Sequence, residues 1–434
     1  MSPELLGFIG LLVLFLLLAL GMWVGAAAAI VGIIGLIVVL GPEQAFMMIG
    51  AGPYGQITNY NMITIPMFVL MGMIIAETKL GSDLYGTAHK WIGHLRGGLA
   101  GATIAACGLM GAVTGGSVSS IAVMSKVAKP QMQKYDYDER LIAGSIASGS
   151  TASIMIPPSF VFVLYGLLTE QSIGQLFVAG ILPGVLQVIL YIGLVYVLCR
   201  LNPQMGPPSF KYSMRERLRS LRDVLPILLL FVLVIGGIYA GKFTPNEAGA
   251  VGSFGALIIV LIKRYITGKG IVKSIVEAGL LTGMILFLIA GIYLFQAFLT
   301  VSKVPFMIGE FVVGLDVPPF VIMFVMIIIY LFLGCILPEG AIVVLTIPIL
   351  YPLIVQLGFD TIWFGVILVK LIGIGQITPP LGMNCFYLSG MSGISLKTIY
   401  SGIVPFLIAD FVHLALLLAF PVISLLLINI GQPL

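Results

Sequence analysis

Charged side chains are scarce in this sequence. It has 21 Lys and Arg and 17 Asp and Glu among 434 residues, or 9% charged, whereas soluble domains have about 25%. Hydrophobic residues make up 60%. A water-soluble protein of this size has too much surface to cover with so few charges. The composition excludes a soluble enzyme, a nucleic-acid-binding protein and a disordered chain, and leaves a polytopic membrane protein.

Cysteine and histidine are also rare, and they do not cluster. The four cysteines lie in apolar stretches without a CxxC pair, and the three histidines are scattered. This excludes a disulfide framework and a transition-metal site of thiolates or imidazoles. No HExxH motif or Ser–His pairing supports an intramembrane enzyme. The amino-terminus lacks a basic n-region, so we predict a retained span at 5–22 rather than a cleaved signal peptide.

Long apolar runs are abundant, and a membrane span needs about 20 such residues. Continuous candidates lie near residues 4–22, 24–41, 60–78, 175–199, 224–241, 244–262, 277–300 and 396–428. Two more stretches, 138–170 and 361–391, are interrupted by the pairs Pro157-Pro158 and Pro379-Pro380. A proline pair ends one half-helix and starts another, so we expect broken spans with breaks at 148–159 and 373–382. The sequence predicts an all-α membrane protein with about ten full spans.

Two other apolar stretches carry a polar turn at mid-length. They cover residues 98–130 and 318–356, with turns at 114–120 and 337–340. Each arm is too short to cross a bilayer comfortably. We therefore expect two re-entrant helical hairpins.

An internal repeat supports this organisation. A shift of 222 residues, without a gap, superposes Pro130 on Pro352, Asp138 on Asp360, Pro157-Pro158 on Pro379-Pro380, Tyr165 on Tyr387, Gly180 on Gly402 and Pro183 on Pro405. Each half has an odd number of spans, so the second half must enter the membrane inverted. Inverted repeats of this kind are typical of secondary transporters.

The repeats are predicted to cover residues 1–208 and 224–434, joined by an amphipathic cytoplasmic connector at 209–223. Each contains scaffold spans, an arm helix, a hairpin, a broken span and a last span. In the first repeat these lie at 4–78, 81–96, 98–130, 138–170 and 175–199, and in the second at 224–300, 303–316, 318–356, 361–391 and 396–428.

Basic residues set the orientation of this topology. Eighteen of the 21 fall on one side, Lys242 and Lys303 fall on the other, and Lys370 lies within a span. The positive-inside rule makes the basic side cytoplasmic. Both termini are then predicted to be periplasmic.

Irregular backbone at mid-membrane depth is tolerated where it lines a polar cavity, so the four interruptions predict one central site. Neutral oxygen donors surround them: Ser117, Ser119, Ser120, Ser150, Thr151, Ser153, Thr378 and Asn384. Hydroxyls with free carbonyls suit Na⁺, a hard cation, and half-helix amino-termini suit an anion. For Ser119, Ser120 and Ser153 we favour simple back-bonding or helix packing.

A proton-coupled carrier would place acids in the pathway. The candidates are Glu339, at the second hairpin turn, with Asp410 and His413 and the basic neighbour Lys370. Asp410 and His413 are three apart on one helix and could satisfy each other. The first half has no acid at its breaks, which favours Na⁺.

Several motifs carry a family resemblance. They are GAVTGGSVSS at 111–120, IPPS at 156–159, LFVAGILPG at 176–184, PILYP at 348–352 and ITPPLGMN at 377–384. With them, the chain resembles the large membrane subunit (M or DctM type) of tripartite ATP-independent periplasmic (TRAP) transporters over nearly its whole length.

The resemblance implies a Na⁺-coupled elevator in the bacterial inner membrane. It also implies a separate small four-helix membrane subunit (Q type), a periplasmic substrate-binding protein (P type) and an organic-acid substrate such as a C4-dicarboxylate, keto acid or sialic acid. One implied cation site comprises Ser117, Gly149 and Ser150, and the other Glu339, Gly375, Thr378 and Pro379. At the second turn, Pro338 stands where the family often has an acid.

The substrate carboxylate is expected between the hairpin turns and the proline breaks. The predicted contacts are Gly116, Pro157, Pro158, Ser159, Pro380 and Asn384. A stand-alone Na⁺/dicarboxylate symporter is the main alternative, and an ion channel is a weaker one.

Overall fold

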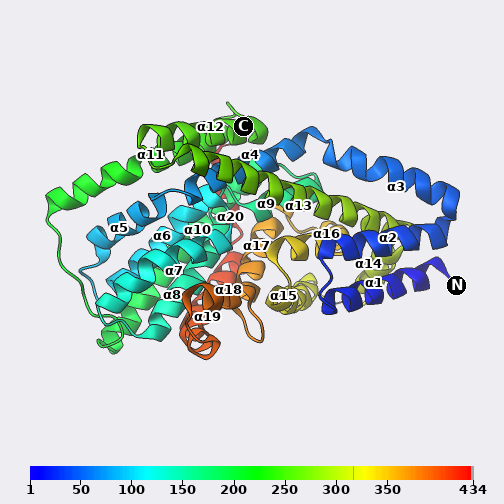
Figure 1. Ribbon diagram of the computed structural model, residues 1–434. Coiled ribbons are helices and arrows are strands. Elements are labelled where there is room, and N and C mark those ends of the chain that lie inside the picture. The colour runs from blue at the N-terminus through cyan, green and yellow to red at the C-terminus, as the bar shows by residue number, and fades with distance from the viewer. Residues whose placement is uncertain (316, 432–434) are drawn as a thin grey trace.

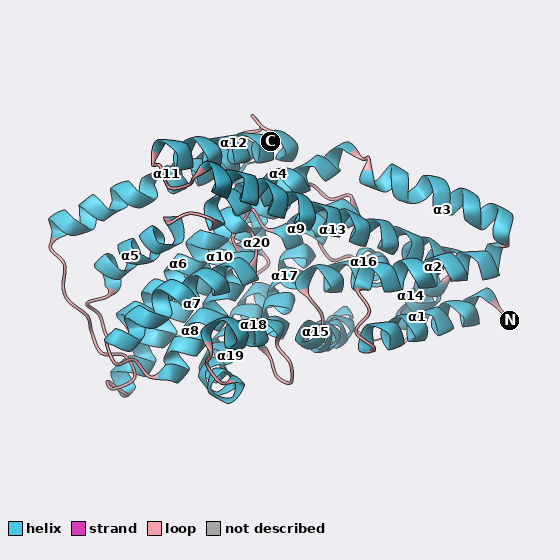
Figure 2. Ribbon diagram, viewed as in Figure 1, coloured by secondary structure: helices cyan, strands magenta, loops and turns pink. Residues whose placement is uncertain are grey.

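The computed structural model describes residues 1–315 and 317–431, and this part of the chain contains helices and no strand (Figures 1 and 2). The first half contains α1 (Pro3–Ala19), α2 (Val24–Leu40), α3 (Pro42–Ile57), the 3₁₀ helix η1 (Tyr60–Ile63), α4 (Thr64–Ala76), α5 (Leu80–Ile92), α6 (Gly98–Thr114), α7 (Ser117–Lys134), α8 (Glu139–Met155), α9 (Phe160–Thr169) and α10 (Ile173–Leu201). The second half contains α11 (Met214–Tyr239), α12 (Pro245–Ile262), α13 (Gly268–Val301), α14 (Val304–Val313), α15 (Pro319–Ile336), α16 (Glu339–Gln356), α17 (Thr361–Ile377), α18 (Met383–Ser392), α19 (Leu396–Ala419) and α20 (Val422–Gly431).

The prediction of an all-helical membrane protein is confirmed. Within the described residues, eight segments are long and apolar enough to cross a membrane, with α8 and α9 counted together as one, or nine if the bent α3–α4 pair forms one span. Four shorter apolar helices, α1, α2, α6 and α17, add to these. In Figure 1, α1, α2, α3 and α14 lie together at one end of the molecule and α5 to α8 at the other, with α9 and α17 between them.

All four predicted interruptions occur as helix ends. The first hairpin turns at Gly115-Gly116, and the second at Leu337-Pro338. Both proline pairs separate two helices, α8 from α9 and α17 from α18, and both Pro–Pro peptide bonds are cis.

The first break is shorter than the sequence predicts. α8 remains helical through residues 148–155 and ends at Met155, so only residues 156–159 interrupt the span. Serine and threonine hydroxyls within this stretch bond back to their own helix: Ser150 Oγ donates to the Ala147 carbonyl at 2.6 Å, and Thr151 Oγ1 to the Ser148 carbonyl at 2.7 Å. The helix therefore persists until the prolines remove their N–H donors. The second break is likewise confined to residues 378–382.

The structure adds a helix between two of the predicted spans. Residues 42–57 form α3, which begins with Pro42 at its first position and bends by 52° into η1 and α4. Two other boundaries differ from prediction. Residues 214–223 are no separate connector, because the Ser213–Glu216 capping box starts α11, which runs unbroken to Tyr239. The last span is interrupted at Phe420-Pro421.

Close backbone contacts join each hairpin to its broken span. α6 packs on α8 at Gly111, where a Cβ would lie 2.3 Å from the Cα of Ser153. α15 packs on α17 at Gly334 and Gly375, where a Cβ on Gly375 would lie 2.5 Å from the Gly334 Cα. Only glycine allows this approach of two helix backbones. These contacts set the position of both hairpin tips.

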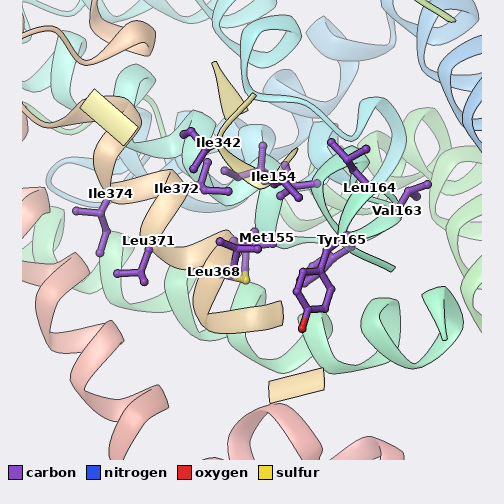
Figure 3. Close-up of a cluster of buried hydrophobic side chains, with 14 of the residues drawn as sticks. Ile154, Met155, Val163, Leu164, Tyr165, Ile342, Leu368, Leu371, Ile372 and Ile374 are labelled. Carbon is purple, nitrogen blue, oxygen red and sulfur yellow. The ribbon is translucent and has the colours of Figure 1, made fainter. Parts of the chain in front are cut away.

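Several helix pairs join the two halves of the chain. α7 packs on α18, and α16 packs on α9; likewise α2 packs on α13, and α4 on α12. Buried side chains of α8, α9, α16 and α17 meet at the centre of the molecule (Figure 3). Among them, Tyr165 donates from its hydroxyl to the Thr361 carbonyl at 2.6 Å, which links α9 to α17. The core therefore draws equally on both halves.

Candidate functional site

The first hairpin tip is built on glycine. Gly115 ends α6 in the left-handed region at φ +64°, a backbone conformation that glycine adopts without strain. Its carbonyl accepts the Phe160 N–H, the first of α9, at 3.3 Å. Gly116 is extended, and α7 begins at Ser117. The tip is thus tied to the first proline break, and the amino-termini of α7 and α9 lie close together.

A chain of buried side-chain hydrogen bonds joins this tip to two other helices. Ser117 Oγ donates to Asn384 Oδ1 at 3.1 Å, and Asn384 Nδ2 donates to Ser150 Oγ at 3.2 Å. Asn384 lies in the first turn of α18, just after the second proline break. None of the three side chains is more than 1% exposed. The structure thus brings together three residues that the sequence singled out, from α7, α8 and α18.

Gly149, the fourth residue of this region, lies on α8 facing α6. A Cβ there would stand 3.2 Å from Cys107 Sγ and 3.3 Å from the Ile104 Cα. The space beside its Cα is filled by α6. The backbone carbonyl is therefore the group that Gly149 could offer to a ligand.

The other hydroxyls near this tip make local bonds, as we expected. Ser119 Oγ donates to the Gly116 carbonyl at 3.0 Å and contacts Thr114 Oγ1 at 2.8 Å. Ser120 and Ser153 share a 2.7 Å bond, and Ser153 Oγ also donates to the Cys107 carbonyl at 2.7 Å. These bonds hold α6, α7 and α8 together.

The second hairpin tip is tied to the second break by a different set of bonds. The Gly382 N–H donates to the Cys335 carbonyl at 3.0 Å, and Gln376 Nε2 donates to the Leu337 carbonyl at 2.9 Å. Gln376 is 2% exposed. Sequence reasoning missed it, although a glutamine within the apolar end of a span, beside a proline pair, was a usable signal.

Glu339 begins α16 and faces the first hairpin tip. Its Oε1 lies 3.9 Å from the point where a Cβ on Gly116 would stand, and its Oε2 has no hydrogen-bond partner among the described residues. Gly375, Thr378 and Pro379 lie along α17 and its end, and no hydrogen bond in the described part joins them to Glu339. In the described part of the chain, no single hydrogen-bond network therefore joins the four residues assigned to a second cation site.

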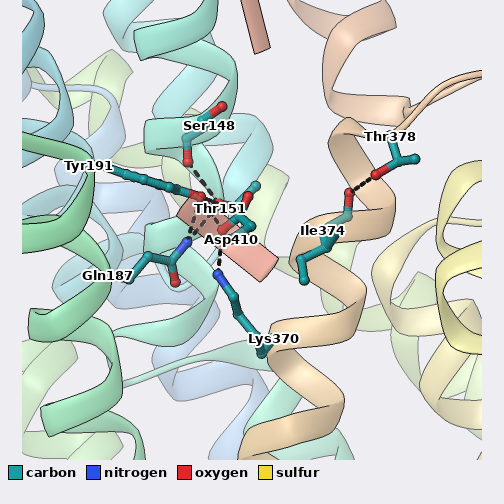
Figure 4. A network of polar contacts seen from close by, with 8 residues as sticks. All are labelled: Ser148, Thr151, Gln187, Tyr191, Lys370, Ile374, Thr378 and Asp410. Carbon is teal, nitrogen blue, oxygen red and sulfur yellow. Dashed lines mark hydrogen bonds and ion pairs between the residues drawn. The ribbon is translucent and has the colours of Figure 1, made fainter. Parts of the chain in front are cut away.

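Thr378 and Gly375 are occupied with structural contacts of their own. Thr378 Oγ1 donates to the Ile374 carbonyl at 2.6 Å (Figure 4), and Gly375 faces Gly334. The Pro379 side chain is exposed, and its carbonyl accepts a 3.6 Å contact from Cys335 Sγ. The carbonyls at the carboxyl end of α17 are the groups that carry partial negative charge here.

A cavity of about 530 Å³ separates the two hairpin tips from α2, α4 and α13. Glu339 and Gly116 line it on the side of the tips, together with Thr114 and Ser119. The opposite wall is apolar and consists of side chains such as Trp23, Val69, Met73, Met284 and Leu288. A small organic molecule fits in this volume.

The residues assigned to the substrate divide between this cavity and its surroundings. Gly116 lines it, whereas Asn384 lies behind the tip in the hydrogen-bonded chain. Pro158 and Ser159 line a separate cavity of about 30 Å³ beside Gly115, and Ser159 Oγ has no partner in the described part of the chain. Pro157 is buried; the Pro380 side chain is exposed, and its carbonyl accepts the Tyr400 hydroxyl at 2.9 Å.

Lys370 and Asp410 form an ion pair, both 1% exposed. Asp410 therefore does not pair with His413, the alternative that their spacing suggested, and both His413 ring nitrogens lack a partner among the described residues. Tyr191 and Gln187 complete this cluster. Both were recognisable in the sequence as polar side chains within a long apolar span.

Comparison with known proteins gives the family. Residues 11–423 match the family described as tripartite ATP-independent periplasmic transporter, DctM component. The chain is 35% identical to the C4-dicarboxylate TRAP transporter large permease protein DctM of Pseudomonas aeruginosa, over 86% of this chain and 87% of that protein. It is 30% identical to the sialic acid TRAP transporter large permease protein SiaM of Vibrio cholerae, with the same coverage.

Another relative is the ectoine/5-hydroxyectoine TRAP transporter large permease protein UehC of Ruegeria pomeroyi, which is 30% identical over 85% of this chain and 86% of that protein. Among solved structures, the YdaH transporter of Alcanivorax borkumensis matches with a TM-score of 0.62 and 12% identity, over 90% of both chains, which shows a shared fold. The family match covers nearly the whole described chain, and the protein belongs to the DctM component family of tripartite ATP-independent periplasmic transporters.

Proposed function

We propose that this chain is the transport subunit of a Na⁺-coupled, binding-protein-dependent system that takes up an organic acid across the bacterial inner membrane. The observation that carries the proposal is the buried chain from Ser117 through Asn384 to Ser150. It joins a hairpin tip to both broken spans at a place where helix ends expose carbonyls and N–H groups.

Sodium is the coupling ion that these groups favour. Na⁺ prefers hard oxygen ligands, and hydroxyls and backbone carbonyls at helix ends supply them without a charged side chain. One cation would bind near Ser117, Gly149 and Ser150. A second would bind between the second hairpin turn, with Glu339, and the carboxyl end of α17, with Gly375, Thr378 and Pro379.

An elevator mechanism accounts for the packing. The exchanged pairs, α7 with α18 and α16 with α9, are what two inverted repeats would produce. In this arrangement the hairpins and the spans after them move as one unit against a scaffold of α1 to α4 and α11 to α13. The 530 Å³ cavity lies at the boundary between the two parts, where a substrate would be carried. With the basic side cytoplasmic, both termini are periplasmic.

The substrate we propose is a carboxylate, bound with its negative charge toward the amino-termini of the half-helices. Three relatives are named as transporters of C4-dicarboxylates, sialic acid and ectoine, and each of these substrates carries a carboxylate. The partners would be a small four-helix membrane subunit and a periplasmic binding protein. The apolar cavity wall would face the body of the substrate.

Reconstitution into proteoliposomes tests the proposal. The chain, its small subunit and the loaded binding protein should give uptake that depends on an inward Na⁺ gradient. Ser150→Ala and Thr378→Ala should each raise the Na⁺ concentration needed for half-maximal uptake. Thr300→Ala is the matched control, because Thr300 makes the same back-bond to the Gln296 carbonyl at 2.8 Å from the exposed side of α13.

Four results would contradict the proposal. Uptake without a Na⁺ gradient, or unchanged Na⁺ dependence in both variants, would exclude the assigned cation sites. Full uptake by this chain alone would replace the tripartite system with a stand-alone symporter. Flux that does not saturate with substrate would indicate a channel.

A further inference from the structure

Four helices meet at a buried polar cluster behind the two breaks (Figure 4). Lys370 comes from α17, Asp410 from α19, Tyr191 and Gln187 from α10, and Thr151 from α8. α8 and α10 belong to the first half of the chain, and α17 and α19 to the second. The Lys370–Asp410 pair itself lies within the second half, and the neutral side chains of Tyr191, Gln187 and Thr151 connect it to the first.

One carboxylate oxygen of Asp410 accepts two hydrogen bonds in this cluster. Asp410 Oδ1 accepts from the Lys370 ammonium and from the Tyr191 hydroxyl, the latter at 2.5 Å. The ammonium also lies 6.0 Å from the centre of the Tyr191 ring. Tyr191 thus bonds to Asp410 and lies with its ring beside the Lys370 ammonium.

A second layer of bonds fixes Tyr191. Gln187 Nε2 donates to the Tyr191 oxygen at 3.0 Å and to Thr151 Oγ1 at 2.9 Å, and the Thr151 and Tyr191 hydroxyls lie 3.2 Å apart. Thr151 follows Ser150, which bonds to Asn384. The cluster is therefore one residue along α8 from the hydrogen-bonded chain of the first hairpin tip.

The titratable groups around the pair are few. Tyr191 faces it from α10 and His413 lies three residues from Asp410 on α19, while α8 contributes the uncharged side chain of Thr151. No other charged side chain among the described residues contacts Lys370 or Asp410. Each charge therefore depends on the other for compensation in this buried region.

Burial makes this dependence strong. Lys370, Asp410 and His413 are each 1% exposed. Removing one member of a buried pair leaves an uncompensated charge, which is costly, whereas removing both can be neutral. A lone buried carboxylate is driven to take up a proton, and a lone ammonium is driven to lose one.

We propose that Lys370 and Asp410 are positioning residues for transport. Lys370 is a tethered cation that permanently neutralises Asp410, joins the second broken span to the last span, and keeps protons out of the coupling cycle. The inference rests on the proposed function, because it assigns the pair to the unit that carries the cation sites. It adds that Asp410 is no site for a coupling proton in the native protein.

Opposite pH profiles of two single variants test this proposal. Lys370→Met leaves Asp410 alone, so its neutral, protonated form should support uptake. Uptake should then be at least about threefold greater near pH 5.5 than near pH 8.5, since each pH unit can change the neutral fraction up to tenfold. Asp410→Asn leaves Lys370 alone, and its neutral form should support uptake. Uptake should then be greater near pH 8.5 than near pH 5.5, by a similar factor.

The double variant Lys370→Met/Asp410→Asn is the control. It carries no unpaired charge, so its profile should be as flat as that of the native protein. Substitution damage alone would lower uptake equally at all pH values, so mirror-image slopes report the pairing itself. Parallel or flat profiles in both single variants would overturn the proposal, as would a native profile that follows that of Lys370→Met.

Thermal unfolding of the purified variants separates this proposal from the proposed function. The midpoint should fall with rising pH in Lys370→Met, whose folded state binds the extra proton, and rise with pH in Asp410→Asn. These slopes do not require transport. Opposite slopes in the two variants, with no Na⁺-driven uptake by the native protein, would refute the proposed function but support the pairing of Lys370 with Asp410. Flat slopes with normal native uptake would refute the pairing proposal alone.

Discussion

The contact between Gly334 and Gly375 makes a sharp prediction, because two helix backbones meet there. A Cβ on Gly375 would lie 2.5 Å from the Gly334 Cα, against an ordinary contact limit of 3.4 Å. Gly375→Ala must therefore push α15 and α17 apart by about 0.9 Å. The neighbouring atoms belong to backbone, so no side chain can turn aside.

The expected cost follows from two opposing effects. Overpacking of this size lowers the free energy of unfolding by about 1–3 kcal/mol. Replacing glycine by alanine within a helix raises it by about 1 kcal/mol. Gly279→Ala on α13 is the matched control, because nothing lies within 4 Å of the new methyl group. The two variants should differ by about 1–3 kcal/mol in stability, with Gly375→Ala the weaker.

Thermal unfolding in detergent measures this difference, and Na⁺-dependent uptake measures its effect on the site. Moving α15 away from α17 stretches the bond from the Gly382 N–H to the Cys335 carbonyl, so the Na⁺ requirement should rise as well. If Gly375→Ala unfolds at the same temperature as Gly279→Ala, the helices do not pack as described and the reasoning fails.

Two further predictions concern the first hairpin tip and the loop after α5. Asn384→Ala leaves the Ser117 hydroxyl without its acceptor and Ser150 without a donor, at a cost of about 1–3 kcal/mol, and should raise the Na⁺ concentration for half-maximal uptake; an unchanged value would remove Asn384 from the site. Desolvation, then the charge of nearby Arg217, lowers the pKa of His94, which lies 3.2 Å from the Arg217 guanidinium. The folded protein thus binds fewer protons there than the unfolded chain, and stability is lost as pH falls through the ordinary histidine value of about 6.5. Hydrogen exchange at the start of α11 should quicken on acidification, and His94→Gln should abolish that step; an identical step in the variant would contradict the assignment.

Much of the fold could be predicted from the positions of proline and glycine in the sequence. The proline pairs and glycine turns gave both broken spans and both hairpins, because proline and glycine act through the local backbone alone. Helix 42–57 was not among the predicted spans, because it is rich in glycine and polar residues; in the structure it packs beside α2 and α13. Ser148–Ser153 were misjudged for the reverse reason: their hydroxyls bond within the helix rather than breaking it.

The site could be predicted in part. Ser117, Ser150 and Asn384 were recognised as oxygen-bearing residues beside breaks, and the structure places them in one chain. Their pairing was beyond sequence reasoning, because Ser117 and Asn384 are 267 residues apart and meet through exchanged packing. The partner of Asp410 was also missed: spacing suggested that His413 could satisfy it, whereas the fold brings Lys370 from a different helix, 40 residues away.

The exchanged packing of α7 on α18 has a consequence for biosynthesis. The first hairpin leaves the ribosome long before α18, yet Ser117 finds its acceptor only when Asn384 has been made. Until then, the polar tip of the hairpin has no partner inside the bilayer, where an unsatisfied hydroxyl is costly. The first hairpin should therefore remain at the membrane surface or with the insertion machinery, and reach its final depth only after nearly the whole chain has been synthesised.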